Sequence, residues 1–180
     1  MTIKMLLLAT AVAAGFSGAA SASTYYATTV VSYTPGTGIT DPDRMVTDHA
    51  LGAPDDEFLS LGLGGSAVFS FGRTFTGPGQ IYEITYSRPG YTETASLFGS
   101  VDGVNYDFIA SVNNTDEESI FTFAGTYNYL KVWDNSPVRA GRDGFDIDAV
   151  SVSAVPIPAA GLLLAGGLGL LGTRKLRRKA

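Results

Sequence analysis

Residues 95–112 read ASLFGSVDGVNYDFIASV, and this stretch decides the fold class of the 180-residue chain. Two runs of β-branched, aromatic and small residues flank Asp102-Gly103, where Gly103 can adopt the positive φ that a tight connection needs. Two such runs on either side of an Asp-Gly pair are typical of antiparallel strands. The stretch therefore predicts a β-hairpin over residues 95–112.

The sequence on both sides of this hairpin also has the character of strands. Between residues 23 and 154, short runs of Thr, Val, Tyr and Phe are separated by Gly, Pro, Asn and Asp, and no stretch has a convincing helical period. A single open sheet would leave one face wet, so the pattern predicts an all-β fold, one antiparallel β-sandwich of two sheets. The expected strands are residues 25–33, 67–71, 80–87, 95–101, 106–112, 119–123, 127–134 and 145–153.

Several short motifs follow one another along this region. They are ALGAPD at 50–55, SLGLGGS at 60–66 leading into VFSF at 68–71, GPG at 77–79, SVDG at 100–103 and GFDIDAV at 144–150. In this order they resemble the galactose-binding-like, discoidin-type jelly-roll domains of bacterial surface proteins. The chain departs from that pattern at Gln80, where the related domains often carry Asp. The resemblance implies a jelly-roll sandwich that binds carbohydrate or another surface ligand and often holds a structural calcium ion.

Loop residues are the expected sugar contacts in such a domain. Aromatic rings stack on pyranose faces, and polar groups on neighbouring loops orient the sugar. On this basis we predict ligand binding by Tyr91, Trp133 and Arg139 or Arg142. The alternative for the two aromatic residues is packing in the core or at its rim.

Four aspartates are candidate calcium ligands. Asp146 and Asp148 lie two apart in an expected strand, so their carboxylates point to the same face, where two like charges are unfavourable unless water or a cation separates them. Asp41 and Asp43 add further oxygen atoms, and calcium takes six to eight such ligands. The alternative is a solvated acidic face, and Asp55-Asp56-Glu57 is predicted to be a solvated run of loop charges.

Charge is distributed unevenly along the chain. Lys4 and the five basic residues near the C-terminus are six of the 12 Lys and Arg, whereas all 17 Asp and Glu lie between Asp41 and Asp148, so the middle of the chain carries a net charge of −11. Such a domain is repelled by nucleic acid and by anionic lipid and favours cations. The chain has no cysteine, which excludes disulfides, thiolate metal sites and cysteine nucleophiles.

The first 22 residues have the pattern of a signal peptide. Lys4 precedes an apolar run over residues 5–16, and the segment ends on Ala20-Ser21-Ala22. Small residues at this spacing suit signal peptidase, which predicts cleavage between Ala22 and Ser23 and export of the remainder. The alternative is an N-terminal membrane anchor.

The C-terminal segment combines three elements. It begins with Val155-Pro156-Ile157-Pro158-Ala159, continues as an uncharged apolar stretch over residues 158–173, and ends in a basic cluster at 174–179. A helix rises about 1.5 Å per residue, so as a helix the apolar stretch is only just long enough to span a membrane. The basic cluster after it predicts that the C-terminus is cytoplasmic. The alternative is a core helix with a basic tail.

This tripartite end resembles the PEP-CTERM class of sorting signals, in the variant whose motif reads Val-Pro-Leu-Pro-Ala, with Ile157 in place of Leu. The resemblance implies processing by an exosortase-type membrane enzyme near residues 156–159. It also implies anchoring in the inner membrane of a Gram-negative bacterium, followed by delivery to the cell surface or the extracellular matrix.

Enzymatic activity has little support in the sequence. His49 is the only histidine, and no nucleophile elbow accompanies it, so we predict no catalytic residue. The predicted function is that of a non-catalytic surface or matrix protein that binds carbohydrate and is associated with exopolysaccharide or biofilm. The alternative is a hydrolase of envelope polysaccharide that uses a pair of acidic residues.

Overall fold

The computed structural model describes residues 23–84, 90–115 and 118–154. The predicted signal peptide up to Ala22, the sorting motif at 155–159 and the apolar stretch at 158–173 lie outside these ranges. No helix in the described ranges is long and apolar enough to cross a membrane.

Nine strands and two short 3-10 helices make up the described chain. The helices η1 (Pro42–Met45) and η2 (Thr47–Ala50) follow each other in the long connection after β2. The strands are β1 (Thr24–Tyr26), β2 (Thr29–Thr34), β3 (Leu59–Ser60), β4 (Ser66–Glu83), β5 (Thr94–Ser100), β6 (Asp107–Asn113), β7 (Glu118–Phe121), β8 (Tyr127–Asp134) and β9 (Asp146–Ala154).

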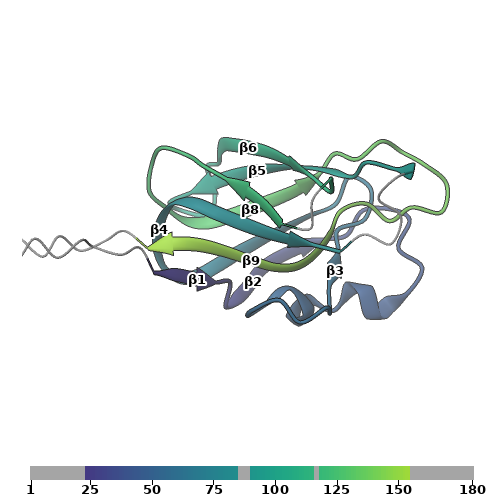
Figure 1. The fold of residues 1–180 in the computed structure, drawn as a ribbon, viewed down its shortest axis with the longest axis horizontal. Coiled ribbons are helices and arrows are strands. Elements are labelled where there is room, and N and C mark those ends of the chain that lie inside the picture. Colours follow the sequence, from purple (N-terminus) through teal and green to yellow (C-terminus); the bar gives the residue numbers. More distant parts are fainter. Residues whose placement is uncertain (1–22, 85–89, 116–117, 155–180) are drawn as a thin grey trace, which may run out of the picture. The chain divides into compact units, whose positions relative to one another are not determined.

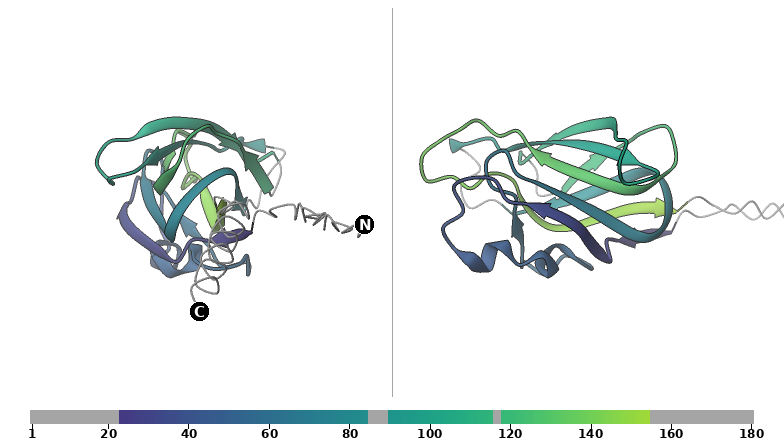
Figure 2. Two further views of the ribbon diagram at one scale, coloured as in Figure 1. Left: turned by 90° about the vertical axis from the view of Figure 1, so that its left-hand side faces the viewer. Right: turned by 180° about the vertical axis from the view of Figure 1, so that it is seen from behind.

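The long strand β4 connects the two layers of the sandwich. Its first half pairs with β2 and β8, and β8 pairs in turn with β5, which pairs with β6. Its second half pairs with β7 and β9, and β9 also pairs with β1 and β3. The register of β4 shifts between Ser70 and Phe75 and again between Thr76 and Gly79, where the strand passes from one layer to the other. Figure 1 shows β5, β6 and β8 on one side of the molecule and β9 and β1 on the other, and the end-on view in Figure 2 shows the strands curving around a common interior.

The predicted hairpin is confirmed. β5 and β6 pair antiparallel with Ala95 opposite Val112, and Gly103 has the expected positive φ of 74°. The connection is longer than a two-residue turn, because the carboxylate of Asp102 accepts hydrogen bonds from the amides of Val104 at 2.9 Å and Asn105 at 2.8 Å and so closes a wider loop. These amides hold the pKa of Asp102 well below its usual range.

Side-chain alternation places the core between the layers. In β8, Leu130 and Val132 are fully buried, whereas Trp133 on the opposite face is 44% exposed. Apolar side chains from both layers fill the interior, among them Leu59, Phe69, Phe75, Ile81, Leu97, Phe145, Ile147 and Val150. The fold class predicted from the sequence, an antiparallel β-sandwich of the jelly-roll type, is confirmed.

Some predicted boundaries are wrong. The expected strand 67–71 and residues 80–83 of the expected strand 80–87 belong to the single strand β4, and residues 85–87 lie outside the described ranges. The expected strand 25–33 is divided into β1 and β2. The 3-10 helices were not expected, since a single turn has too few residues to produce a helical period. The Gly and Pro residues between Phe71 and Gln80 have the composition of a loop, although the backbone there continues as a strand from one layer to the other.

The connections that bear on function project from one end of the sandwich. Residues 135–145 and the first part of 35–58 lie at the right of Figure 1, where β9 begins, and not at the end marked by its arrowhead, and the second part of 35–58 runs along the lower edge toward β3. We call this end, formed by residues 35–58, 90–93 and 135–145, the loop end.

Candidate functional site

The loop end is organised around the short helix η1. The carboxylate of Asp41 accepts a hydrogen bond from the amide of Asp43 at 3.1 Å, and Pro42 occupies the first helical position, where a missing N–H costs nothing. Arg44 in the same turn reaches the carboxylate of Asp143 at 2.5 Å. Its guanidinium also lies over the ring of Phe58, 4.9 Å from the ring centroid. The turn therefore places the guanidinium of Arg44 against the ring of Phe58 and against the loop before β9.

A hollow of about 260 Å³ lies beside this arginine. Phe58, Arg44 and His49 contribute to its wall. The Nε2 atom of His49 lies 3.3 Å from a carboxylate oxygen of Glu57. Glu57 and the remaining lining residues are acidic, the others being Asp41, Asp43 and Asp56. We call this feature the acidic hollow; it presents an aromatic ring, hydrogen-bond donors and several acceptors to one small volume.

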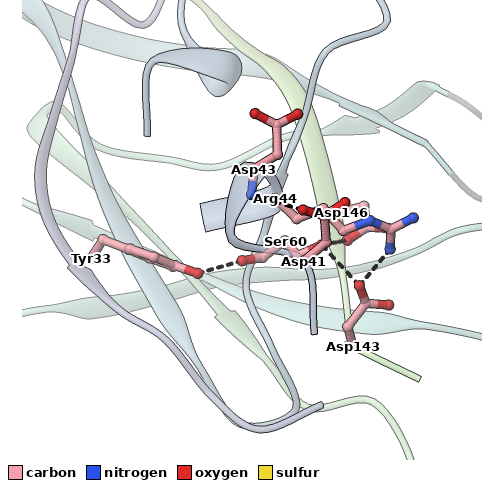
Figure 3. A network of polar contacts seen from close by, with 7 residues as sticks. All are labelled: Tyr33, Asp41, Asp43, Arg44, Ser60, Asp143 and Asp146. Carbon is pink, nitrogen blue, oxygen red and sulfur yellow. Dashed lines mark hydrogen bonds and ion pairs between the residues drawn. The ribbon is translucent and has the colours of Figure 1, made fainter. Parts of the chain in front are cut away.

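A polar network around the buried residues Ser60 and Asp146 continues from Asp143, the partner of Arg44. The hydroxyl of Ser60 donates a short hydrogen bond to Asp146 and also contacts Asp143 at 3.3 Å. The hydroxyl of Tyr33 donates to the carbonyl oxygen of Ser60 at 2.6 Å, and Figure 3 shows Ser60 between these partners. Burial raises the pKa of Asp146 to about 8, which the hydrogen bond from Ser60 opposes and the nearby Asp143 reinforces. Burial and the charge of Asp146 raise the pKa of Tyr33 to about 12.

Asp134 joins three segments at the base of the loop end. Its carboxylate is 1% exposed and accepts hydrogen bonds from the amide of Gly64 at 2.8 Å and from the amide of Phe145 at 3.0 Å. It also accepts one from the hydroxyl of Ser136 at 2.6 Å. The residue thus binds the start of β4, the end of β8 and the start of β9 to one another. Nothing in the sequence around Asp134 predicts that it lies next to the start of β9.

The four predicted calcium ligands have different partners. Asp41 accepts from the amide of Asp43, and Figure 3 shows the carboxylate of Asp43 pointing away from Ser60. Asp148 accepts from two backbone amides, at 3.0 and 3.3 Å, although burial raises its pKa. Asp146 is bound to Ser60. In the described ranges no three His, Asp or Glu side chains are grouped closely enough to hold a metal ion. The four carboxylates therefore do not fit one common calcium site, and calcium binding stays a prediction from the sequence.

Three of the four predicted ligand-binding residues lie together. The guanidinium of Arg142 lies 5.1 Å and that of Arg139 5.8 Å from the centroid of the Tyr91 ring. The hydroxyl of Tyr91 donates to the carbonyl oxygen of Pro137 at 2.5 Å. Desolvation, together with nearby carboxylates, raises the pKa of Tyr91. The loop before β9 therefore holds two arginines against one tyrosine.

The fourth predicted residue, Trp133, lies elsewhere. It projects from the outer face of β8, and its indole N–H donates to the carbonyl oxygen of Gly64 at 3.2 Å. Its ring packs near Phe98, with centroids 6.4 Å apart, and among the described residues no ring contact joins it to Tyr91.

Sequence reasoning missed the residues of the acidic hollow. Arg44 and Phe58 were not candidates, His49 was considered for catalysis alone, and Asp56 and Glu57 were interpreted as solvated loop charges. The side chain of Glu57 is 64% exposed, as that interpretation expects, but it also pairs with His49. The only feature of the sequence that could have indicated the hollow is Phe58 directly after the acidic run Asp55-Asp56-Glu57. That feature does not predict a site by itself, because the fold brings Arg44 to Phe58.

Comparisons with known proteins bear on the fold. No protein-family model and no curated protein sequence matches the chain. Among solved structures, the chain is similar to a truncated AlyQ with CBM32 and alginate lyase domains, with a TM-score of 0.53 and 12% identity over 75% of this chain. The match spans 35% of that longer protein.

Two further structures are matched over nearly their whole length. A pectin-binding carbohydrate-binding module has a TM-score of 0.53 and 15% identity, with 72% of this chain and 95% of the module covered. The C-terminal domain of a chitobiase from Bacteroides fragilis has a TM-score of 0.51 and 17% identity, with 72% of this chain and 94% of that domain covered. At these identities the likeness is one of fold. The described part of the chain thus has the β-sandwich fold found in these carbohydrate-binding modules.

Proposed function

We propose that this protein is an exported surface protein whose β-sandwich binds carbohydrate at the loop end without converting it. The observation that carries the proposal is the acidic hollow, which Phe58, Arg44 and His49 line together, with the guanidinium of Arg44 over the Phe58 ring. Sugars offer apolar ring faces and hydroxyl groups, so one aromatic ring among fixed donors and acceptors matches their chemistry. The fold shared with a pectin-binding carbohydrate-binding module supports this assignment.

The hollow is built on loops that a rigid sandwich positions. Arg44 is held between Phe58 and Asp143, and Asp146 and Ser60 support the loop behind it. A ligand that meets prearranged groups loses less binding energy to the ordering of side chains. Binding without large rearrangement is therefore expected.

The proposal of binding without turnover rests on the available chemical groups. The chain offers one histidine, His49, whose Nε2 atom is paired with Glu57. A hydrolase with an acidic pair is the second candidate, because Asp41, Asp43, Asp56 and Glu57 line the same hollow.

The test is binding of the full chain, purified in detergent, to a glycan array, followed by calorimetry on the glycans that bind. Phe58→Ala should weaken binding roughly three- to tenfold, the value of one aromatic contact. Phe108→Ala is the matched control, because this exposed ring lies on β6, away from the loop end. Equal loss in both variants would show that the hollow is not the site.

Turnover is measured on the same glycans by release of reducing ends. No release is expected. Release that disappears when one of the four carboxylates of the hollow is changed to its amide would establish the hydrolase instead.

Export and sorting are a separate part of the proposal and rest on the sequence of the two ends. We expect a signal peptidase cut between Ala22 and Ser23 and exosortase-type processing within residues 155–159, with delivery to the cell surface or matrix, where exopolysaccharide is the expected partner. Intact-mass analysis of the protein from its native host tests both cuts. A mass equal to that of the uncut chain would contradict them.

A further inference from the structure

Two arginines share the ring of Tyr91 at the loop end. Their guanidinium carbons lie 5.1 and 5.8 Å from its centroid. The tyrosine is 8% exposed, and its hydroxyl is bound to the carbonyl oxygen of Pro137, so the ring cannot turn freely. Cations are attracted to the face of an aromatic ring, and a fixed ring therefore serves as a support for both guanidinium groups.

A tight turn places the two arginines on this support. The amide of Arg142 donates to the carbonyl oxygen of Arg139 at 3.3 Å, and Gly141 between them has a φ of +72°. A positive φ at the third position is the property of a type II turn and favours glycine there. The first and fourth residues of such a turn are close neighbours, which is why both side chains reach the same ring.

Neither guanidinium has a carboxylate within 4.0 Å among the residues that the structure describes. The adjacent acid, Asp143, is bound to Arg44 and not to Arg142. Arg139 directs one donor to the carbonyl oxygen of Gly90 at 2.6 Å. A guanidinium has five N–H donors, so the pair retains donors for an external group.

The two arginines stand in a domain whose net charge is −11. Two carboxylates lie near them, since Glu93 and Asp134 raise the pKa of Tyr91 and Arg142 opposes them. Both carboxylates are buried and accept hydrogen bonds from side chains of the protein, so the arginines supply the donors for an external anion at Tyr91. The planar fork of a guanidinium matches the paired oxygens of a carboxylate or a sulfate.

We propose that Arg139 and Arg142 form an anion-binding pair that gives the loop end a preference for acidic glycans, those that carry carboxylate or sulfate groups. This inference rests on the proposed function, because it names the class of glycan that the site takes. The residue after Arg142, Asp143, is the ion-pair partner of Arg44, which lines the acidic hollow, so the pair and the hollow belong to the same end of the sandwich.

The experiment compares charged and neutral polymers with the same backbone. Polygalacturonate is tested against its methyl ester, and dextran sulfate against dextran, with the full chain in detergent at about 0.15 M salt. We expect tighter binding of a charged polymer than of its neutral counterpart. Arg142→Gln should reduce that binding about tenfold or more, as expected for loss of a charge-assisted hydrogen bond, and leave the neutral polymer unaffected.

Arg73→Gln is the matched control. Arg73 also lies over a tyrosine ring, 3.7 Å from the centroid of Tyr25, but on β4 near β1, away from the loop end, and its change removes the same single charge. Competition by galacturonate but not by galactose tests the wild-type protein, so the result does not depend on how well a variant folds.

The outcomes separate this inference from the proposed function. Equal affinity for charged and neutral polymers, or equal loss in Arg142→Gln and Arg73→Gln, would overturn the anion-binding pair while glycan binding stands. Absence of binding to every glycan would overturn both. A preference lost in Arg142→Gln alone would support the pair, and the polymer preferred would identify its anion as carboxylate or sulfate.

Discussion

The guanidinium of Arg44 lies 2.5 Å from the carboxylate of Asp143, a residue 99 positions away in the chain. Both side chains are mostly shielded, with exposed fractions of 29% and 17%. The contact joins the connection after β2 to the connection before β9. It thereby links the acidic hollow to the loop that carries Arg139 and Arg142.

Arg44→Met should lower the free energy of unfolding by about 1–3 kcal/mol, because it leaves the carboxylate of Asp143 partly buried without its cation. Urea unfolding of the full chain measures the change. Glu57→Gln is the control, since it removes the other ion pair of the loop end, in which the Glu57 side chain is 64% exposed. Its effect should stay below about 0.5 kcal/mol. Similar losses in both variants would contradict a structural role for the Arg44 pair.

Asp134→Ala should destabilise the domain by about 3 kcal/mol, because the buried amide of Phe145, the buried Ser136 hydroxyl and the amide of Gly64 lose their acceptor. Asp102→Ala is the comparison, as this carboxylate also accepts backbone amides but in an exposed loop where water can replace it. The midpoint of thermal unfolding gives the order of the two effects. A larger fall in the midpoint for Asp102→Ala would show that burial of the carboxylate does not determine how much its removal destabilises the domain.

Asp146 should make stability depend on pH. Its pKa is about 8 in the folded protein against an ordinary value of 3.8, so between these values the unfolded chain binds fewer protons than the folded one. The free energy of unfolding therefore falls as pH rises from about 4 to about 8, by at most about 1.4 kcal/mol per pH unit, and this contribution levels off above that range.

Asp146→Asn provides the test of this assignment, because an amide does not titrate. The difference in melting temperature between wild type and variant should grow in favour of the variant from pH 5 to pH 8. A constant difference across that range would show that Asp146 titrates normally in the fold.

Chelation separates the sequence-based calcium prediction from the arrangement in the structure. Asp148 and Asp41 accept backbone amides and Asp146 binds Ser60, so the loop end is connected by hydrogen bonds among its own groups. These hydrogen bonds alone give the same melting temperature in calcium and in chelator, whereas the calcium prediction gives a higher one in calcium, since a ligand that binds the folded state alone raises its stability. A rise with calcium that Asp146→Asn abolishes would confirm the calcium prediction, and an unchanged melting temperature would contradict it.

Much of the architecture is encoded in short stretches. The run of aromatic and branched residues over 127–134 predicts β8 with its observed bounds, and Asp102-Gly103 predicts the pairing of β5 with β6. The continuity of β4 could not be predicted, because its Gly-Pro-Gly segment at 77–79 has the composition of a loop. Whether such a segment stays extended depends on partners such as β9, which come late in the chain.

The candidate site was predictable in part. Tyr91, Arg139 and Arg142 stood out as aromatic and cationic residues in loops, and the structure brings them together. Trp133 met the same criteria but lies on the outer face of β8. The position of Phe58 beside Arg44 has no local signature, since it depends on the path of a whole connection.

Periodicity, charge and the two terminal patterns can be recognised in the linear chain, because each depends on residues that are close in sequence. They specify an acidic β-sandwich, and they predict its export. The meeting of Arg44 with Asp143, of Asp134 with Phe145, and of two arginines with Tyr91 depends on the packing of distant connections at one end of the sandwich. Bringing such distant loops together costs chain entropy, and the burial of the core compensates that cost. These contacts therefore form only in the folded protein.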